Sequence, residues 1–280
     1  MVPDVLADRR WLVLTGAGVS TDSGIPDYRG PGSVARSPMT YQEFLGTESN
    51  RRRYWARAHV GWSRLSGAQP NATHRWLAER QDDLAGLITQ NVDTLHERAG
   101  HRDVVDLHGR IDRVRCLDCR AMSERTAVHR RLDELNPGWS DQDATVLPDG
   151  DVALEATEGF LLADCEHCAG RLKPDVVFFG ESVPKGVVAR CFSLVDDAEA
   201  LVVLGSSLQV MSGLRFVRHA AKRGIPTVIV NRGATRGDDL ATIKIDGGVA
   251  ETLHGWGPRP RLQDFGVGII RLDTAAKTSW

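Results

Sequence analysis

The chain has 280 residues, of which 41% are hydrophobic and 26% are charged, as in a globular protein of one large or two modest domains. Its formal net charge of -2 argues against broad electrostatic binding of nucleic acid. No apolar run approaches the length of a membrane span, and the first ten residues lack the apolar core of a signal peptide. We therefore expect a cytoplasmic monomer that binds neither nucleic acid nor membranes.

The first structured segment is an apolar run at residues 11–15, which predicts a buried strand. Gly16 and Gly18 follow it directly, and glycines at this spacing let backbone N–H groups approach a phosphate in dinucleotide-binding α/β domains. The fingerprint is incomplete, because Thr21 stands where its third glycine would fall. The motif leaves two interpretations open, a nucleotide-binding loop and a tight strand-to-helix turn without a ligand.

After this loop the pattern becomes helical and then alternates between strands and helices. Apolar residues recur with helical spacing between 40 and 65, and Asn71 is placed to cap another helix that runs to about Arg80. Further helices are predicted at 95–99, 123–135, 186–195 and 212–223. Buried strands are predicted at 84–89, 104–107, 176–179, 200–204, 227–230 and 243–245. The alternation predicts a Rossmann-like, doubly wound parallel sheet with right-handed crossovers.

Small polar turns follow four of the predicted strands, and they are Gly16-Ala17, Gln90-Asn91, Gly205-Ser206 and Asn231-Arg232. The carboxyl ends of parallel strands lie at one edge of a sheet, where open α/β folds bind their ligands. We therefore expect these turns to line one extended cleft. His108 follows another strand, so it is a candidate general base, although a lone histidine is more often structural.

Four of the five cysteines form two Cys-x-x-Cys pairs, Cys116 with Cys119 and Cys165 with Cys168. Two such pairs can complete the tetrahedral coordination of one structural zinc ion. A redox pair and an iron–sulfur site are the alternatives. The fifth cysteine, Cys191, lies in an apolar helical pattern and is expected to be buried. A zinc-ribbon binding module without catalysis is one possible function for a chain with these pairs.

Several of these motifs, taken together, resemble the sirtuins. They occur in the sirtuin order and span about residues 11 to 250. The matching stretches are 16–29, 89–93, 107–109, the two cysteine pairs, 173–181, 205–207 and 230–231. The stretch 53–57, with Gly61-Trp62 and Thr21-Asp22, resembles the class II branch, which includes a mitochondrial sirtuin.

The resemblance implies an NAD-dependent protein lysine deacylase, which cleaves NAD to nicotinamide and transfers the acyl group of an acylated protein lysine to ADP-ribose. Mono-ADP-ribosyl transfer to protein on the same scaffold is the alternative activity. The implied organisation is a Rossmann-like NAD-binding domain at 1–112 and 173–280, which carries a helical insertion at 33–80. A small zinc-binding module occupies 113–172.

The resemblance also assigns roles to individual residues. His108 would be the catalytic base, and Cys116, Cys119, Cys165 and Cys168 would hold one structural Zn²⁺. The substrate peptide would pair with Val177, Phe178, Phe179 and Gly180 as an added β-strand. The residues implied in NAD binding are Gly16, Ala17, Gly18, Ser20, Asp27, Tyr28, Arg29, Gln90, Asn91, Asp93, Gly205, Ser206, Ser207, Asn231, Arg232, Gly233 and Val249.

Overall fold

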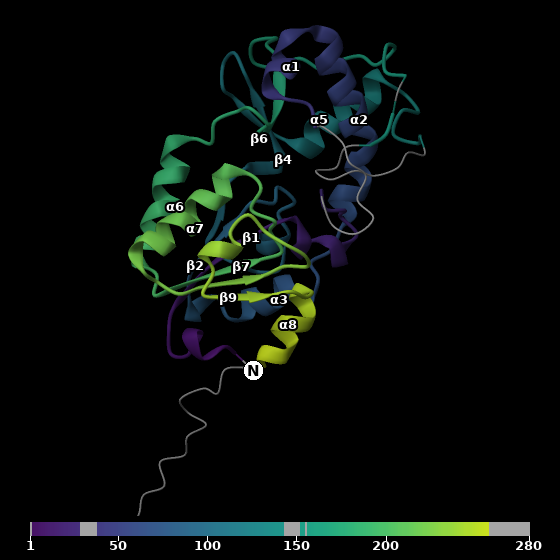
Figure 1. Ribbon diagram of the computed structural model, residues 1–280. Coiled ribbons are helices and arrows are strands. Elements are labelled where there is room, and N and C mark those ends of the chain that lie inside the picture. Colours follow the sequence, from purple (N-terminus) through teal and green to yellow (C-terminus); the bar gives the residue numbers. More distant parts are fainter. Residues whose placement is uncertain (1, 29–37, 143–151, 155, 258–280) are drawn as a thin grey trace, which may run out of the picture.

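A six-stranded parallel sheet forms one of two lobes in the computed structural model, which describes residues 2–28, 38–142, 152–154 and 156–257 (Figure 1). All neighbouring strands in this sheet are parallel. Their spatial order is β3 (Val104–Asp106), β2 (Leu84–Thr89), β1 (Trp11–Thr15), β7 (Ala200–Leu204), β8 (Thr227–Val230) and β9 (Ile243–Ile245). The predicted doubly wound parallel sheet is confirmed.

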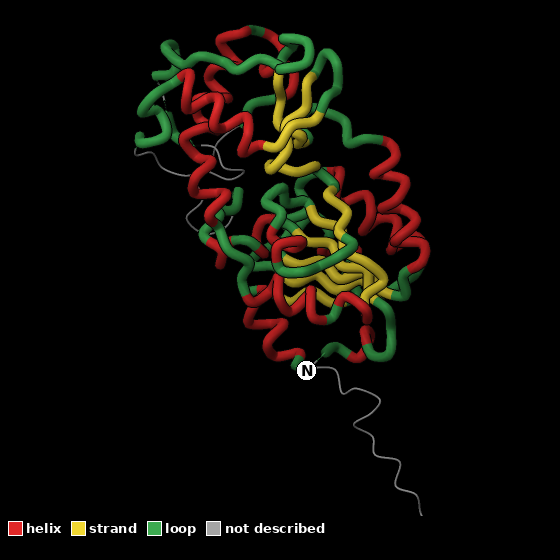
Figure 2. The backbone as a smooth tube through the Cα atoms, turned by 180° about the vertical axis from the view of Figure 1, so that it is seen from behind, coloured by secondary structure: helices red, strands yellow, loops and turns green. Residues whose placement is uncertain are grey.

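Helices cover both faces of this sheet, as Figures 1 and 2 show from opposite sides. Helices α6 (Lys185–Asp197) and α7 (Met211–Arg223) pack on one face, and α3 (Ala72–Glu79) and α8 (Val249–Trp256) pack on the other. Successive residues of β1 enter opposite cores, so the whole strand is buried and it is apolar up to its last residue, Thr15. Cys191 of α6 is fully buried, as expected.

Local signals explain several helix ends. The Asn71 side chain accepts hydrogen bonds from the first turn of α3, and His74 completes a capping box there. Helix α7 stops at Gly224, which has a φ of 71°, a conformation that glycine adopts without strain. Helix α4 (Leu95–Arg98) is followed by Gly100 in the same way, with a φ of 98°. Sequence patterns predicted all three ends, whereas the short helix α8 was missed.

The second lobe contains a three-stranded antiparallel sheet flanked by helices. Its strands, in spatial order, are β5 (Met122–Glu124), β4 (Gly109–Cys116) and β6 (Leu172–Val176). Its helices are α1 (Tyr41–Gly46), α2 (Glu48–Gly67) and α5 (Arg125–Leu135). Phe44 and Trp55 from the first two helices share one core with Val128, Leu132 and the buried cysteines. The two predicted insertions therefore pack together, while the exact domain boundaries stay a prediction.

The predicted strand at 176–179 is wrong. The strand is Leu172–Val176, and it pairs with β4 of the small sheet instead of joining the large one. The apolar run continues past Val176, but the backbone N–H of Phe178 turns to the Glu181 carboxylate at 2.9 Å and leaves the ladder. Strands β4 and β5 were also missed, because β4 alternates buried residues with charged, exposed ones and carries no continuous apolar run. Within the described ranges, no helix combines the length and hydropathy of a membrane span.

Candidate active site

Two glycine turns meet at the point where the strand order of the sheet reverses, between β1 and β7. The N–H of Gly18 donates to the carbonyl of Gly205 at 2.9 Å. A Cβ on Gly16 would lie 2.7 Å from the Cβ of Ser206, and Gly205 has a φ of +60°. Side chains at these positions would separate the two turns. Open α/β sheets bind ligands at such a switch point. The third glycine of the fingerprint is missing, but the close approach of the two turns is present without it.

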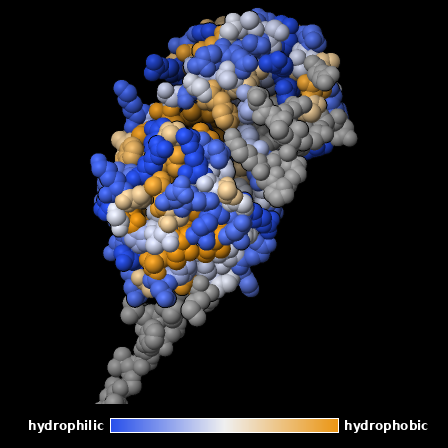
Figure 3. Space-filling view, viewed as in Figure 1, coloured by the Kyte–Doolittle hydropathy of each residue, from blue (hydrophilic) through white to orange (hydrophobic). Residues whose placement is uncertain are grey.

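The turns open onto a cavity of about 1050 Å³ between the two lobes. Figure 3 shows apolar residues gathered where the lobes meet. All four predicted strand-end turns line this cavity, which confirms that they share one cleft. Of the residues implied in NAD binding, Val249 is not among its lining residues, because this first residue of α8 packs in the core. Arg29 lies outside the described residues.

A polar network joins the β1 and β2 ends at the cavity. The Ser20 hydroxyl donates to Asp93 at 2.6 Å, and the Asn91 amide donates to Ser20 at 3.0 Å and to the Gly16 carbonyl at 3.1 Å. Burial raises the pKa of Asp93 above its usual value, and the Ser20 hydrogen bond offsets part of that rise. Ser20, Asn91 and Asp93 therefore form a preorganised polar wall.

Gln90 fixes the next part of the wall. Its Nε2 donates to the Ser206 hydroxyl at 2.8 Å and to the Thr15 carbonyl at 3.2 Å. Behind it, a Cβ on Gly213 would lie 2.6 Å from Oε1 of Gln90. The glycine at the start of α7 thus lets this amide lie across the ends of three strands.

His108 is held by hydrogen bonds at both ring nitrogens. Its Nδ1 lies 2.8 Å from the Gln90 carbonyl oxygen, and its Nε2 lies 2.8 Å from the Ser212 hydroxyl. A carbonyl oxygen can only accept, so the proton sits on Nδ1 and Nε2 of the neutral ring is the basic atom. Burial lowers the pKa of His108, and the charge of Arg215 acts in the same direction. The ring is therefore neutral at pH 7, as a general base must be.

Several cavity residues have no counterpart in the sequence-based site. Ser212 and Arg215 come from α7, Tyr54 and Leu65 from α2, and Ile111 from β4. Ser212 lies at the start of a predicted helix, shortly after the 205–207 turn that ends a strand. That position was the one sequence signal that could have identified Ser212 as a cavity residue. The α2 side chains read as ordinary core positions of a helix and gave no such signal.

The β8 end forms the outer part of the cavity. The Asn231 side-chain amide donates to the Arg232 carbonyl at 2.8 Å, which closes a tight turn. The Lys244 ammonium donates to the Asn231 carbonyl, also at 2.8 Å. Arg232 pairs with Glu251 of α8 at 2.8 Å. This rim is polar and exposed, unlike the wall around His108.

Residues 177–180 lie along the cavity wall in the order predicted, although outside a strand. The Val177 N–H donates to the His108 carbonyl at 2.7 Å, which ties this segment to the base. Phe178 is buried in the core of the second lobe. Phe179 is 36% exposed, and its ring lies 6.1 Å from that of Tyr28. The buried ring of Phe178 therefore anchors the segment, while the ring of Phe179 remains partly exposed.

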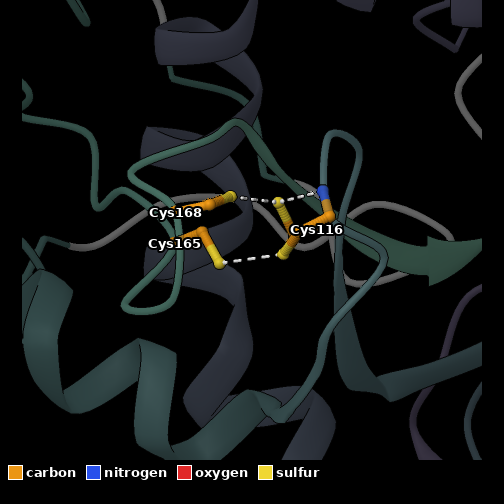
Figure 4. Close-up of side chains that lie close together, drawn as sticks. Cys116, Cys165 and Cys168 are labelled. Carbon is orange, nitrogen blue, oxygen red and sulfur yellow. Dashed lines mark hydrogen bonds between the residues drawn. The ribbon is translucent and has the colours of Figure 1, made fainter.

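The four paired cysteines converge within the second lobe, and Figure 4 shows Cys116, Cys165 and Cys168 close together. Sγ of Cys116 lies 3.6 Å from that of Cys168, and Sγ of Cys119 lies 3.7 Å from that of Cys165. A disulfide needs about 2.05 Å, whereas the thiolates of a tetrahedral zinc site lie about 3.8 Å apart. The two pairs sit in matching turns, each followed by a residue with positive φ, Arg120 and Ala169. These residues fit one structural zinc ion, and none of them lines the cavity.

Comparison with known proteins fits this geometry. A family model described as the Sir2 family matches residues 16–212. The chain belongs to the Sir2 family. It is 56% identical to "NAD-dependent protein deacetylase 1" of Mycobacterium avium (strain 104) over 256 residues, which cover 89% of this chain and 91% of that protein. It is 55% identical to "NAD-dependent protein deacetylase 1" of Streptomyces coelicolor over 250 residues, which cover 87% of this chain and 84% of that one.

Two solved structures described as Sir2 complexes are similar to this Sir2-family chain. A structure described as "Sir2-p53 peptide-NAD+" superposes with a TM-score of 0.73 at 31% identity, covering 90% of this chain and 94% of that one. A second, "Sir2 bound to acetylated peptide", gives a TM-score of 0.70 at 30% identity with the same coverage of both chains. This Sir2-family chain thus shares its fold with these solved neighbours.

Proposed function

We propose that the chain is an NAD-dependent protein lysine deacylase. The observation that carries the proposal is His108, a neutral histidine whose basic Nε2 faces a cavity lined by the four strand-end turns. The names of the relatives, "NAD-dependent protein deacetylase", support the same reaction class. The alternative activity, mono-ADP-ribosyl transfer, would use the same cavity, and the experiment below separates the two.

The cavity residues divide into two groups in this proposal. Gly16, Ala17, Gly18, Gly205, Ser206, Ser207, Asn231, Arg232 and Gly233 would hold the adenosine and phosphate side of NAD. Ser20, Asp27, Tyr28, Gln90, Asn91 and Asp93 would surround the nicotinamide side. The first group is rich in glycine and backbone amides, which suit phosphates, and the second group forms the preorganised polar wall. For Arg29 the proposed role in NAD binding rests on the resemblance. Val249 would act only indirectly, by supporting the cavity wall from the core.

When bound, NAD supplies the ribose carbon that receives the acyl oxygen as nicotinamide leaves. In this proposal Nε2 of His108 takes a proton from a hydroxyl group, while Nδ1–H stays hydrogen-bonded to the Gln90 carbonyl. That bond fixes the ring and stabilises the charged form that arises after proton transfer. Asp93 holds Ser20 and the start of α4 through its two oxygens, so the polar wall of the cavity keeps its shape.

The acylated lysine would enter beside residues 177–180, whose peptide bonds run along the cavity wall. Binding through main-chain hydrogen bonds would give affinity with little demand on the substrate sequence. The four cysteines would hold a closed structural zinc with no catalytic task. The class II assignment, a cytoplasmic location, the monomeric state and the absence of a nucleic-acid or membrane partner also remain proposals, and they rest on the sequence alone.

The test is nicotinamide release from NAD with a panel of acyl-lysine peptides that carry acetyl, acidic and long-chain groups. We expect release that depends on at least one acylated peptide, with matching formation of free lysine. Labelled ADP-ribose that becomes attached to protein without any acyl-lysine would favour the transferase alternative. No release with any peptide, from protein that binds NAD in calorimetry, would contradict the deacylase.

Replacing Ser212 with alanine is expected to weaken the base, because the Ser212 hydroxyl lies 2.8 Å from Nε2 of His108 and holds the ring from α7. The ring loses one of its two anchors, so kcat at pH 8 should fall about threefold to tenfold. The exposed Ser193→Ala on α6 is the control. A kcat within about twofold of wild type would show that Ser212 does not position the base.

A further inference from the structure

Three side chains that the deacylase proposal does not use converge between the two helices of the second lobe. His59 projects from the middle of α2, while His129 and Asp133 lie four residues apart on one face of α5. Nε2 of His59 lies 3.1 Å from Oδ1 of Asp133, and Nε2 of His129 lies 3.4 Å from Oδ2 of the same carboxylate. One donor atom from each residue lies within 4.8 Å of the other two. None of the three lines the large cavity.

The two distances between a histidine nitrogen and the Asp133 carboxylate match those between the ligands of one metal ion. Zinc binds imidazole nitrogen and carboxylate oxygen at about 2.0–2.2 Å, which places tetrahedral ligands about 3.3 Å apart. A histidine and an aspartate at positions i and i+4 of a helix point the same way, and His59 of the facing helix supplies the third direction. Two imidazoles with one carboxylate form a donor set preferred by zinc and similar divalent transition metals.

Burial gives a second, independent reason to expect a ligand. The His59 side chain is 0% exposed, its Nδ1 has no hydrogen-bond partner within the described part of the chain, and its Nε2 lies 3.1 Å from the Asp133 carboxylate without making a hydrogen bond of good geometry. Nδ1 of His129 is buried without a partner as well. Leaving polar atoms buried and unpaired is unfavourable, and a metal ion at Nε2 would relieve this for His59. Asp133 is 41% exposed, so water can reach the remaining coordination position.

We propose that His59, His129 and Asp133 form a second metal site, separate from the four cysteines, which binds a divalent transition metal such as Zn²⁺. The ion would join α2 of the helical insertion to α5 of the cysteine module. The buried guanidinium of Arg125 acts electrostatically on both imidazoles and opposes a second positive charge. The site therefore binds more weakly than four thiolates, and a mild chelator empties it first.

The test is the zinc content of the full-length protein after saturation with Zn²⁺ and gel filtration. Wild type should carry two zinc ions per chain, and Asp133→Asn and His59→Phe should carry one. The phenylalanine keeps a ring in the core beside Phe160, so the packing there is retained while the metal ligand is lost. Glu134→Gln, an exposed neighbour on the same helix, is the matched control and should keep two ions.

Two further measurements distinguish the site from the cysteines. Co²⁺ added to protein whose cysteines already hold zinc should give weak visible bands without thiolate charge transfer, and Asp133→Asn should lose them. Zinc at one hundred times the dissociation constant of this site should raise the Tm of wild type by about 5 °C, with no such rise in the variant. One zinc per saturated wild-type chain, or a second ion that persists in both variants, would overturn the proposal. Neither result depends on the deacylase activity.

Discussion

The His108→Ala variant is expected to lose acyl transfer by about a hundredfold to ten-thousandfold in kcat, because it lacks the basic Nε2 that accepts the proton. The measurement is single-turnover acyl transfer with the peptide that gives the fastest nicotinamide release. NAD binding should change little, since the imidazole bonds to Gln90 and Ser212 and not to the glycine turns. A variant that retains activity within about threefold of wild type would exclude His108 as the base.

The pH dependence of the wild type provides a second check on the same residue. Burial places the pKa of His108 below its ordinary value of 6.5. A base works only when unprotonated, so activity should be level at neutral pH and fall as the pH drops through that lowered pKa. The acid limb should be absent from the residual activity of His108→Ala.

The fold should survive the same substitution. His108 lines the cavity, so water can replace the lost hydrogen bonds to the Gln90 carbonyl and the Ser212 hydroxyl. We expect a Tm within about 3 °C of wild type. The control is His219→Gln on α7, a residue paired with Asp196 at 2.7 Å and absent from the cavity lining, which should keep full activity. A large fall in Tm for His108→Ala would show that the ring also supports the fold.

The Cys116→Ala variant is expected to show the opposite behaviour, with loss of zinc and unfolding of the cysteine module. Structural zinc sites contribute about 10–16 kcal/mol of binding free energy in small peptides, which exceeds the stability of most domains. Cys116 is fully buried in the core that also contains Phe44 and Phe178. Zinc content, thermal unfolding and limited proteolysis within 113–172 measure the effect.

Activity should be lost with the module, even though no cysteine lines the cavity. Phe178 anchors the cavity wall in the same core, so the proposed peptide-binding segment would lose its support. Cys191→Ala is the matched control, because Cys191 is equally buried but packs in the core under α6 and α7. It should cost about 1 kcal/mol and keep its zinc. Wild-type thermal unfolding in Cys116→Ala would contradict structural zinc.

Much of the large sheet could be predicted because its information is local. Strands buried on both faces read as continuous apolar runs, and the predicted bounds of β1, β2, β7, β8 and β9 match those observed. Caps such as Asn71 and Gly224 depend on the chemistry of single residues. The small sheet has neither signal, since β4 alternates and β6 contains Pro174, so its strands were misplaced or missed.

The sequence by itself determined the parallel sheet, the alignment of four polar turns at one edge, and the cysteine spacing, because each follows from short-range periodicity or from a fixed motif. Only the tertiary structure decided which nitrogen of His108 is basic, since Gln90 and Ser212 lie 18 and 104 residues away in the chain. It also decided that His59 meets Asp133 and that Val249 faces the core. These contacts join elements remote in sequence, and their geometry depends on how those elements pack within each lobe.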